Sequence, residues 1–287
     1  MKIFNNTKIP KNFKGSALAI GNFDGVHAGH KKVFQQAKKI AKKKKIKFGV
    51  LTFTPLPVMF FNKKIKNYRL TSEDQKLKLF KKSKVDFTIN IKFNKKFSAI
   101  GAEDFIKKII YKKLNPELLA VSNNFKFGKN RKGDVNLLEK FSNKYDYHLL
   151  NIKPFKHSKK IVSSTKIRKY LKRGHVNLAN KLLSRTWYIE GQVKKGKKIG
   201  RKLGYRTCNI NVKNYILPKP GIYAVKVLVG NKKYIYGGVA YLGASPTFGG
   251  KKIFLETYIF GIKKNLYKKK LRVYFLKFLR PDQKFKN

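Results

Sequence analysis

The sequence predicts an α/β plus β architecture: an N-terminal domain with a doubly wound, Rossmann-like parallel sheet, followed by a C-terminal antiparallel β-barrel. In the first part of the chain, apolar strand-like runs alternate with helix-like stretches, which is the order of a parallel sheet. After Trp187 the pattern changes to short alternating segments, separated by turns rich in Gly, Asn and Lys. With 287 residues available, we expect two domains, over residues 1–184 and 185–287.

The elements of the first domain are read from hydrophobic spacing. Short apolar runs predict its strands, over residues 17–20, 46–53, 85–91, 118–121 and 148–152. Apolar residues at helical spacing predict its helices, over residues 31–43, 73–82, 102–114, 137–145, 164–172 and 176–183. Ligands of such sheets bind at the carboxyl ends of the strands, and each expected strand here ends in polar or Gly-rich sequence.

The second domain is expected to be built from strands alone. Residues alternate between apolar and polar over 188–193, 222–229, 234–241, 254–260 and 271–278. Thr207 and Asn209 are expected on a further strand, where a spacing of two places both side chains on one face.

The chain is strongly basic, with 70 Lys and Arg against 13 Asp and Glu and a net charge of +57. Only nine of the 70 are Arg, whereas specific nucleic-acid readers favour the planar guanidinium. We interpret the charge as compositional drift. The resulting surface should attract anionic ligands and, at low salt, RNA without specificity. A dedicated nucleic-acid-binding protein is the alternative.

The cysteine count and the lengths of the apolar runs indicate the cellular compartment to expect. Cys208 is the single cysteine, which excludes an internal disulfide and agrees with a reducing cytoplasm. No apolar run reaches the length of about 18–20 residues that a membrane span needs. No apolar signal-peptide core precedes Lys11. We therefore expect a cytoplasmic protein with no membrane partner, and the pattern predicts no particular oligomeric state.

A Gly-rich turn with two histidines, GNFDGVHAGH over residues 21–30, separates the first expected strand from the first expected helix. Amide donors and the helix dipole favour phosphate there, and the glycines let backbone approach a ligand closely. His27 and His30 are suited to donate to phosphate oxygens during phosphoryl or nucleotidyl transfer. The alternative is a tight turn with two surface histidines. No Gly-Lys-Ser/Thr follows, so the run is not a P-loop.

The run over residues 21–30 resembles the HxGH nucleotidyltransferase family. Its full length resembles, more narrowly, the N-terminal half of bacterial bifunctional riboflavin kinases/FAD synthetases. The resemblance implies that His27 and His30 are catalytic, while Asp24 fixes the loop or contacts ribose. It also implies further nucleotide or phosphate contacts at Gly21, Phe23 and Gly29.

A second family motif is SSTKIR over residues 163–168, which matches the signature SSTxIR. Hydroxyls and amides at a helix start, with Arg168 one turn on, suit a leaving pyrophosphate. The resemblance therefore implies that Ser164, Thr165 and Arg168 hold that group. The alternative for the serines is a helix N-cap.

Two further stretches of the first domain resemble the family less closely. Residues 122–128, SNNFKFG, imply a nucleotide contact at Asn124, which is equally typical of a turn. Phe125 and Phe127 are candidates to pack the flavin or to join the core. Residues 51–57, LTFTPLP, stand where the family has a TFDPHP-like run, so Thr54 and Leu56 replace its acid and its histidine.

The second domain resembles riboflavin kinases over residues 191–210. Thr207 and Asn209 occupy the polar positions of the family's PTAN core and are expected to hold Mg²⁺ together with ATP phosphates. Arg206 and Cys208 replace its Pro and Ala, and Cys208 is expected to face away from the ligands as inert packing. Contacts to the nucleotide phosphates are implied at Gly196, Gly200, Arg201 and Gly204.

Glu256 is the only acid between Glu190 and Asp282, and it lies in an apolar strand, LETYIF. The strand resembles the family's LE-x-H-IF, which implies that Glu256 is the general base for the riboflavin 5′-hydroxyl. The alternative is an exposed residue on a polar strand face. Gly261 stands where the family has an acid, and the chain ends without the family's next helix, so we expect a C-terminally short kinase domain.

Together these motifs predict a bifunctional enzyme of flavin cofactor biosynthesis. ATP would phosphorylate riboflavin to FMN in the second domain. FMN phosphate would then attack the α-phosphorus of ATP in the first, giving FAD and pyrophosphate. ATP is thus a substrate and Mg²⁺ the expected metal. An alternative is an enzyme that retains only one of the two activities.

Overall fold

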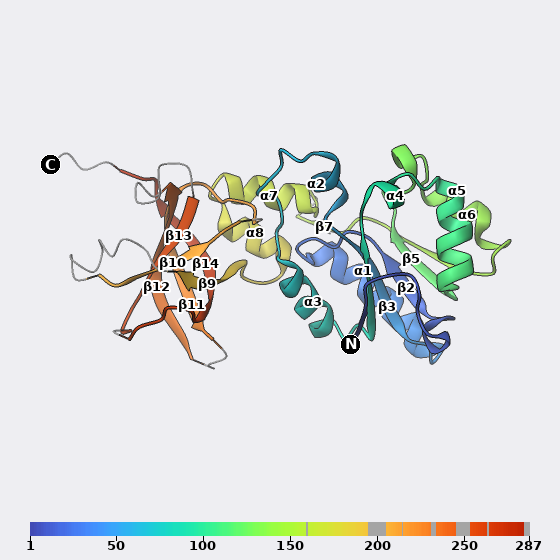
Figure 1. The fold of residues 1–287 in the computed structure, drawn as a ribbon, viewed down its shortest axis with the longest axis horizontal. Helices are drawn as coiled ribbons and strands as arrows, with labels where there is room; N and C mark the ends of the chain where they lie inside the picture. The colour runs from blue at the N-terminus through green and yellow to red at the C-terminus, as the bar shows by residue number, and fades with distance from the viewer. Residues whose placement is uncertain are drawn as a thin grey trace. The chain divides into compact units, whose positions relative to one another are not determined.

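The computed structural model describes residues 1–158, 160–194, 205–213, 215–230, 234–244, 253–262 and 264–283 (Figure 1). The contacts divide the chain into two compact units. Residues 1–65 and 73–162 form the first unit, and residues 66–72 and 163–287 form the second. No helix within the described ranges is long and apolar enough to cross a membrane.

A parallel six-stranded sheet forms the centre of the first unit, in the order β1-β4-β3-β2-β5-β6. All neighbouring strands in it run parallel. From β2 the chain forms β3 and then β4 on one side of that strand. It then crosses to the other side of β2 and forms β5 and β6, so the topological switch point lies between β2 and β5. The strands are β1 Lys2–Phe4, β2 Ala17–Ile20, β3 Phe48–Thr54, β4 Phe87–Lys92, β5 Leu118–Ser122 and β6 His148–Ile152.

Helices flank this sheet, as a doubly wound fold requires (Figure 1). The predicted Rossmann-like class is therefore confirmed. The helices are α1 Ala28–Lys43, α2 Pro57–Phe61, α3 Glu73–Lys82, α4 Lys95–Ser98, α5 Ala102–Asp104, a π-type helix Phe105–Leu114 and α6 Val135–Ser142. Short 3₁₀ turns cover Lys11–Phe13 and Lys129–Arg131, and a two-stranded ribbon is formed by β7 Lys156–His157 and β8 Lys160–Ile161.

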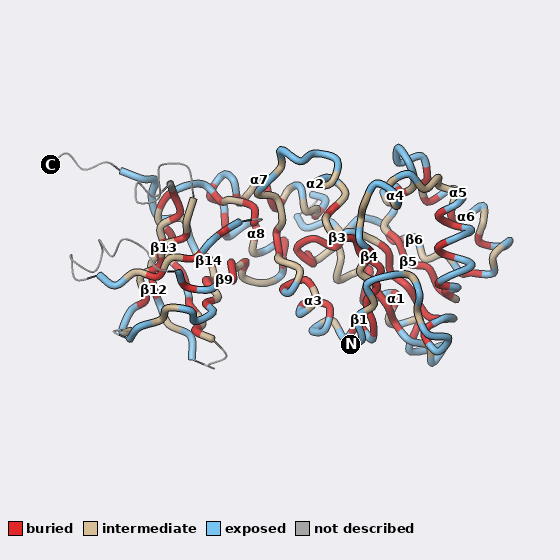
Figure 2. The backbone as a smooth tube through the Cα atoms, viewed as in Figure 1, coloured by how far each residue is buried: buried red, intermediate tan, exposed pale blue. Residues whose placement is uncertain are grey.

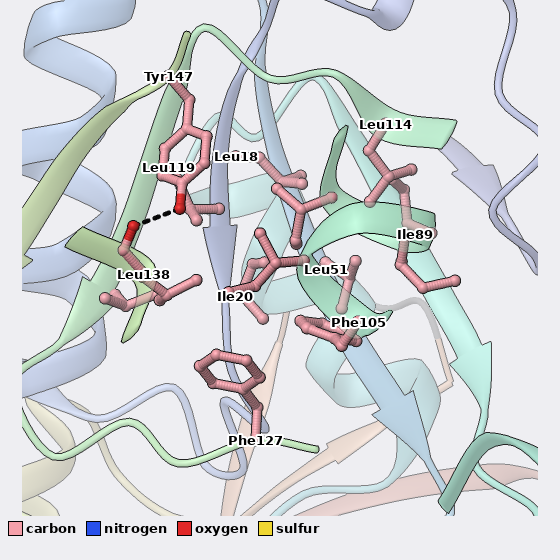
Figure 3. Packing of buried hydrophobic residues seen from close by; sticks show 14 of the residues in the cluster. Leu18, Ile20, Leu51, Ile89, Phe105, Leu114, Leu119, Phe127, Leu138 and Tyr147 are labelled. Atoms are coloured by element: carbon pink, nitrogen blue, oxygen red, sulfur yellow. Dashed lines mark hydrogen bonds between the residues drawn. The ribbon is translucent and has the colours of Figure 1, made fainter. Parts of the chain in front are cut away.

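Side chains alternate across the sheet and build a core on each face. On β2, Leu18 and Ile20 face one core, whereas Ala17 and Ala19 face the other. Figure 3 shows the first core, in which Leu51 and Phe105 pack beside the β2 residues. The central strands β2, β3 and β5 are buried along nearly their whole length, as the red tube of the sheet in Figure 2 shows, whereas the edge strand β1 is largely exposed.

The predicted helix over 102–114 is confirmed in position but has a wider winding. After one α turn, residues Phe105–Leu114 form a π-type helix, and the Asn115 N–H closes it on the Ile110 carbonyl at 2.7 Å. The phenylalanine, the three isoleucines and the leucine of this stretch are all buried and belong to the core that packs on the sheet, whereas Tyr111 is exposed.

The second unit is a closed antiparallel barrel preceded by two helices. Its strand order is β10-β13-β12-β11-β14-β9, which confirms the predicted barrel. The helices are α7 Ser164–Lys172 and α8 Val176–Leu183. The strands are β9 Tyr188–Lys194, β10 Thr207–Asn211, β11 Gly221–Val229, β12 Ile235–Ala244, β13 Ile253–Ile259 and β14 Lys270–Arg280.

A short segment from the N-terminal half, residues 66–72, belongs to this second unit. The Arg69 carbonyl accepts from the Ile216 N–H at 2.8 Å, and the Leu70 carbonyl accepts from Nε1 of Trp187 at 2.8 Å. Leu70 and Trp187 are both buried. No hydrophobic spacing signals this segment, because its partners lie more than a hundred residues away in the sequence.

Trp187→Phe is expected to destabilise the full chain by about 1–3 kcal/mol, because the bond from Nε1 to the Leu70 carbonyl is lost and the smaller ring fills less of a buried site. Urea titration followed by circular dichroism would measure the loss. Tyr205→Phe is the matched control: the side chain is 59% exposed, so a change below about 0.5 kcal/mol is expected. An unchanged urea midpoint for Trp187→Phe would contradict the anchoring role of residues 66–72.

Two candidate active sites

The two histidines of the first unit form a stacked pair at the start of α1. Their ring centroids lie 3.5 Å apart with an interplanar angle of 20°. His27 is the N-cap of the helix, and its Nδ1 accepts from the backbone N–H of His30 at 3.3 Å. Since Nδ1 accepts, the ring proton of neutral His27 lies on Nε2, the atom suited to donate to a phosphate oxygen.

Glycines and one phenylalanine support the histidine pair. A Cβ on Gly29 would lie 3.2 Å from atoms of the His27 ring, so a larger residue would press on that ring. A Cβ on Gly21 would lie 3.1 Å from the Phe23 ring. Phe23 is buried and meets His30 edge-on, with centroids 5.2 Å apart. These contacts shape the turn, while the predicted nucleotide contacts of Gly21, Phe23 and Gly29 stay predictions.

The backbone between β2 and α1 is strained. Phe23 and Val26 have φ values of 47° and 39°, a region that side-chain-bearing residues rarely occupy, and Gly25 has a φ of 83°. Such strain concentrates at ligand-binding turns. Asp24, in the middle of this stretch, is 4% exposed, which agrees with a loop-fixing role.

Asn124 lies at the carboxyl end of β5, across the switch point from the histidine turn. The Ser122 hydroxyl and the Asn124 amide oxygen are 2.9 Å apart. The Asn123 N–H donates to the Ile152 carbonyl at 3.1 Å, which joins this turn to β6. Strands β2 and β5 are neighbours, so Asn124 and the turn share the edge where doubly wound sheets bind ligands.

A cluster of phenylalanine rings occupies the same edge near β3 and β4. Phe93 lies 5.3 Å from Phe60, 5.8 Å from Phe61 and 5.7 Å from Phe97, between ring centroids. Phe53, in β3, lies 6.0 Å from Phe93. Phe61 is 69% exposed, which is unusual for so large an apolar ring. No sequence motif singles out this phenylalanine cluster, although Phe53 and Phe93 come at the ends of neighbouring strands.

Phe125 and Phe127 stack on each other with centroids 5.4 Å apart. Phe127 is buried and packs on Phe105 at 5.3 Å, so it belongs to the core. Thr54 and Leu56, which stand in place of the family's acid and histidine, have structural roles here. The Thr54 hydroxyl lies 3.0 Å from the Asn90 amide oxygen, and Leu56 is buried at the start of α2.

The SSTKIR motif opens α7 in the second unit. Ser163 is the cap, since its Oγ accepts from the Lys166 N–H at 3.2 Å, and Ser164 and Thr165 follow in the first turn. Arg168 is buried: its Nε donates to the Tyr68 carbonyl at 2.9 Å, and its guanidinium carbon lies 3.8 Å from the Tyr68 ring centroid. Arg168 thus also holds residues 66–72. The predicted pyrophosphate contacts of this motif stay predictions.

Thr207, Asn209 and Glu256 come together on neighbouring strands of the barrel. Asn209 of β10 lies opposite Glu256 of β13, and the Thr207 hydroxyl donates to Oε1 of Glu256 at 2.5 Å. All three are half-buried, whereas the residues between them, Cys208 and Thr257, are buried inside. The three polar side chains therefore share the outer face of the barrel.

A tyrosine that the sequence did not single out extends this face. Tyr241 of β12 lies opposite Glu256, and its hydroxyl donates to Oδ2 of Asp282 at 2.7 Å. Burial, the Asp282 hydrogen bond and the charges of Asp282 and Glu256 raise the pKa of Tyr241 to about 12. It therefore stays a donor at neutral pH. A Cβ on Gly243 would lie 2.1 Å from the Tyr241 hydroxyl, so the ring needs a glycine there.

The predicted phosphate contacts Gly196, Gly200, Arg201 and Gly204 lie outside the described residues. Among the residues that the structure does describe, no group of three or more His, Cys, Asp and Glu side chains is arranged to hold a metal ion. Thr207 and Asn209 each carry a side-chain oxygen on one face of β10, and their predicted role as magnesium ligands stays a prediction.

Cys208 faces the barrel interior, as predicted, and burial raises its pKa to about 11. We expect the native chain to resist a thiol reagent at pH 8, where the unfolded chain reacts, because the reagent needs an accessible thiolate. As the pH rises, the Cys208 thiol ionises in the unfolded chain before it does so in the folded chain. The contribution of Cys208 to the free energy of unfolding is therefore fully present below about pH 8.5 and is lost as the pH rises toward 11. Labelling with and without urea checks the first expectation; equal rates would contradict it.

The doubly wound unit carries a histidine pair at its switch point, and the closed barrel carries a Thr–Asn–Glu face. These features define the class as a two-domain protein, α/β followed by a β-barrel, with one candidate active site in each domain. Family models agree with this division. The FAD synthetase model matches residues 9–166, and the riboflavin kinase model matches residues 183–287.

Curated relatives extend the match over nearly the whole chain. Bifunctional riboflavin kinase/FMN adenylyltransferase from Buchnera aphidicola (strain Sg) is 40% identical, covering 98% of this chain and 89% of the relative. The protein of that name from Escherichia coli K12 is 33% identical, covering 99% and 90%. The chain belongs to the family of bifunctional riboflavin kinase/FMN adenylyltransferases.

A solved structure has the same fold. A crystal structure described as a macrolide-efflux protein from Streptococcus pneumoniae matches with a TM-score of 0.85 and 26% identity, over 99% of this chain and 92% of that chain. The α/β and barrel units are thus shared at a sequence identity well below that of the Buchnera relative.

Proposed function

We propose that this chain phosphorylates riboflavin to FMN with ATP and then adenylylates FMN to FAD, releasing pyrophosphate. We assign the adenylyltransferase to residues 1–184 and the kinase to residues 185–287. The presence of both family domains in one chain carries this proposal. The clusters at His27 and Glu256 support it, because each has the chemistry that its reaction needs.

In the kinase reaction, Glu256 accepts the proton of the riboflavin 5′-hydroxyl as the hydroxyl oxygen attacks the γ-phosphorus of ATP. The bond from the γ-phosphorus to the β,γ-bridging oxygen breaks, and ADP leaves. Thr207 orients the carboxylate through its hydrogen bond to Oε1. A hydroxyl that donates still has lone pairs, so Thr207 can hold Glu256 and, with Asn209, coordinate Mg²⁺. The bound ion would neutralise charge on the ATP phosphates.

In the adenylyltransferase reaction the nucleophile is the FMN phosphate itself, so the enzyme has to position it and stabilise charge. His27 and His30 donate to the transferring phosphate at the positive end of α1. Ser164, Thr165 and Arg168 hold the departing pyrophosphate. The phenylalanine cluster supplies an aromatic surface at the same sheet edge, which suits the flavin ring.

The test is incubation of the full chain with riboflavin, ATP and Mg²⁺, followed by chromatographic separation of FMN and FAD. We expect FMN to appear first and FAD after it, and neither without ATP. A second reaction started from FMN isolates the adenylyltransferase. Accumulation of FMN with no FAD in either reaction would mean that only the kinase activity is retained.

A further inference from the structure

Lys76 of α3 is a lysine placed where lysines are rarely found. Its side chain is buried, at 5% exposure, and among the described residues no other lysine is buried. Nζ donates to the Thr52 hydroxyl at 3.0 Å. Taking an ammonium group out of water costs several kcal/mol in proteins, so a chain with many exposed lysines has no need to bury one for solubility.

Thr52 connects this ammonium group to the histidine turn. Thr52 is fully buried near the carboxyl end of β3, and its hydroxyl donates to the Asn22 carbonyl at 3.1 Å. An ammonium group can only donate, so Lys76 takes a lone pair of the hydroxyl and directs its hydrogen toward Asn22. Asn22 precedes Phe23, whose ring contacts His30. Lys76, Thr52 and Asn22 therefore form one directed chain that ends in the turn.

The turn needs such an anchor. Its backbone has positive φ at Phe23 and Val26, which a short loop keeps only if its surroundings hold it. The Gly21 N–H donates to the Leu51 carbonyl at 3.1 Å. The hydrogen bonds between β2 and β3 therefore fix Gly21, the residue before Asn22. Thr52 fixes Asn22 itself, beyond the end of that ladder.

We propose that Lys76 is a positioning residue for adenylyl transfer: acting through Thr52, it holds the Asn22 carbonyl and so keeps the 21–30 turn in the conformation that presents His27 and His30 to phosphate. This rests on the proposed adenylyltransferase function of the first unit. Misplacing reacting groups by about 1 Å can cost about a hundredfold in rate.

The test compares Lys76→Met and Thr52→Val, which remove the charge and the hydroxyl with little change in volume. We expect kcat for FAD formation from FMN to fall about 10–100-fold in each. The kcat of the double variant should be no lower than that of either single variant, because both substitutions break the same hydrogen-bonded chain. Thr52→Ser keeps the hydroxyl and should restore most of the rate. KM for ATP should change much less than kcat.

Two controls separate positioning from folding. Riboflavin phosphorylation by the same variants should be unchanged, because that reaction uses the other unit. Thr88→Val removes a buried hydroxyl from the neighbouring strand β4, away from the turn, and should leave FAD formation unchanged. An unchanged kcat in Lys76→Met, an equal loss of both reactions, or no rescue by Thr52→Ser would overturn the proposal. A wild-type chain that makes no FAD contradicts the proposed function itself.

Discussion

Replacing Glu256 with glutamine is expected to slow FMN formation from riboflavin by about 10²–10⁴-fold, the usual contribution of a general base. Glutamine has the same size, and its amide oxygen can still accept from the Thr207 hydroxyl, so the outer face of the barrel should keep its geometry. It cannot take the proton of the 5′-hydroxyl. Conversion of FMN to FAD by the same variant should continue at the wild-type rate.

Steady-state rates of both reactions, measured on one preparation by chromatography, would check this. Glu117→Gln is the matched control, because it removes a carboxylate whose side chain is 40% exposed and which pairs with Lys44 at 2.5 Å in the first unit. Exposed ion pairs contribute about 0–1 kcal/mol, so neither rate should change. If Glu256→Gln lowered both reactions equally, the assignment of one reaction to each domain would be wrong.

Local periodicity was enough to predict most of the fold. The helices expected over 164–172 and 176–183 match α7 and α8 residue for residue, since each has a compact apolar face that ends sharply. Strand β1 was missed, because it is three residues long and largely exposed and exists through its pairing with β4. Such a strand is set by tertiary contacts, which a local pattern does not contain.

The candidate site residues show the same difference between what a local pattern contains and what tertiary contacts add. His27 and His30 lie in one turn of sequence, so their proximity could be predicted directly. Glu256 was predicted as a base from the family resemblance, but its contact with Thr207 depends on the β10–β13 register across 49 residues. The bond from Tyr241 to Asp282 spans 41 residues and carries no motif. Lys76 looks like any surface lysine until the fold buries it.

His27→Asn should lower FAD formation from FMN by about 10²–10³-fold, the loss typical for a donor that stabilises developing charge. Asparagine is a strong N-cap, so its side-chain oxygen can replace Nδ1 as the acceptor for the His30 N–H and keep α1 intact. What disappears is the imidazole donor and its stacking on His30. The variant thus separates the catalytic role of His27 from its capping role, which His27→Ala would remove together.

Initial rates with FMN and ATP, compared with riboflavin phosphorylation by the same protein, give the measurement and its internal reference. His148→Asn makes the same chemical change at an exposed position of β6 and should leave both rates unchanged. Because α1 keeps its cap, the thermal midpoint of His27→Asn should stay within a few degrees of wild type. An FAD synthesis rate within about threefold of wild type, which is less than 1 kcal/mol of transition-state stabilisation, would leave the histidine pair without a catalytic role.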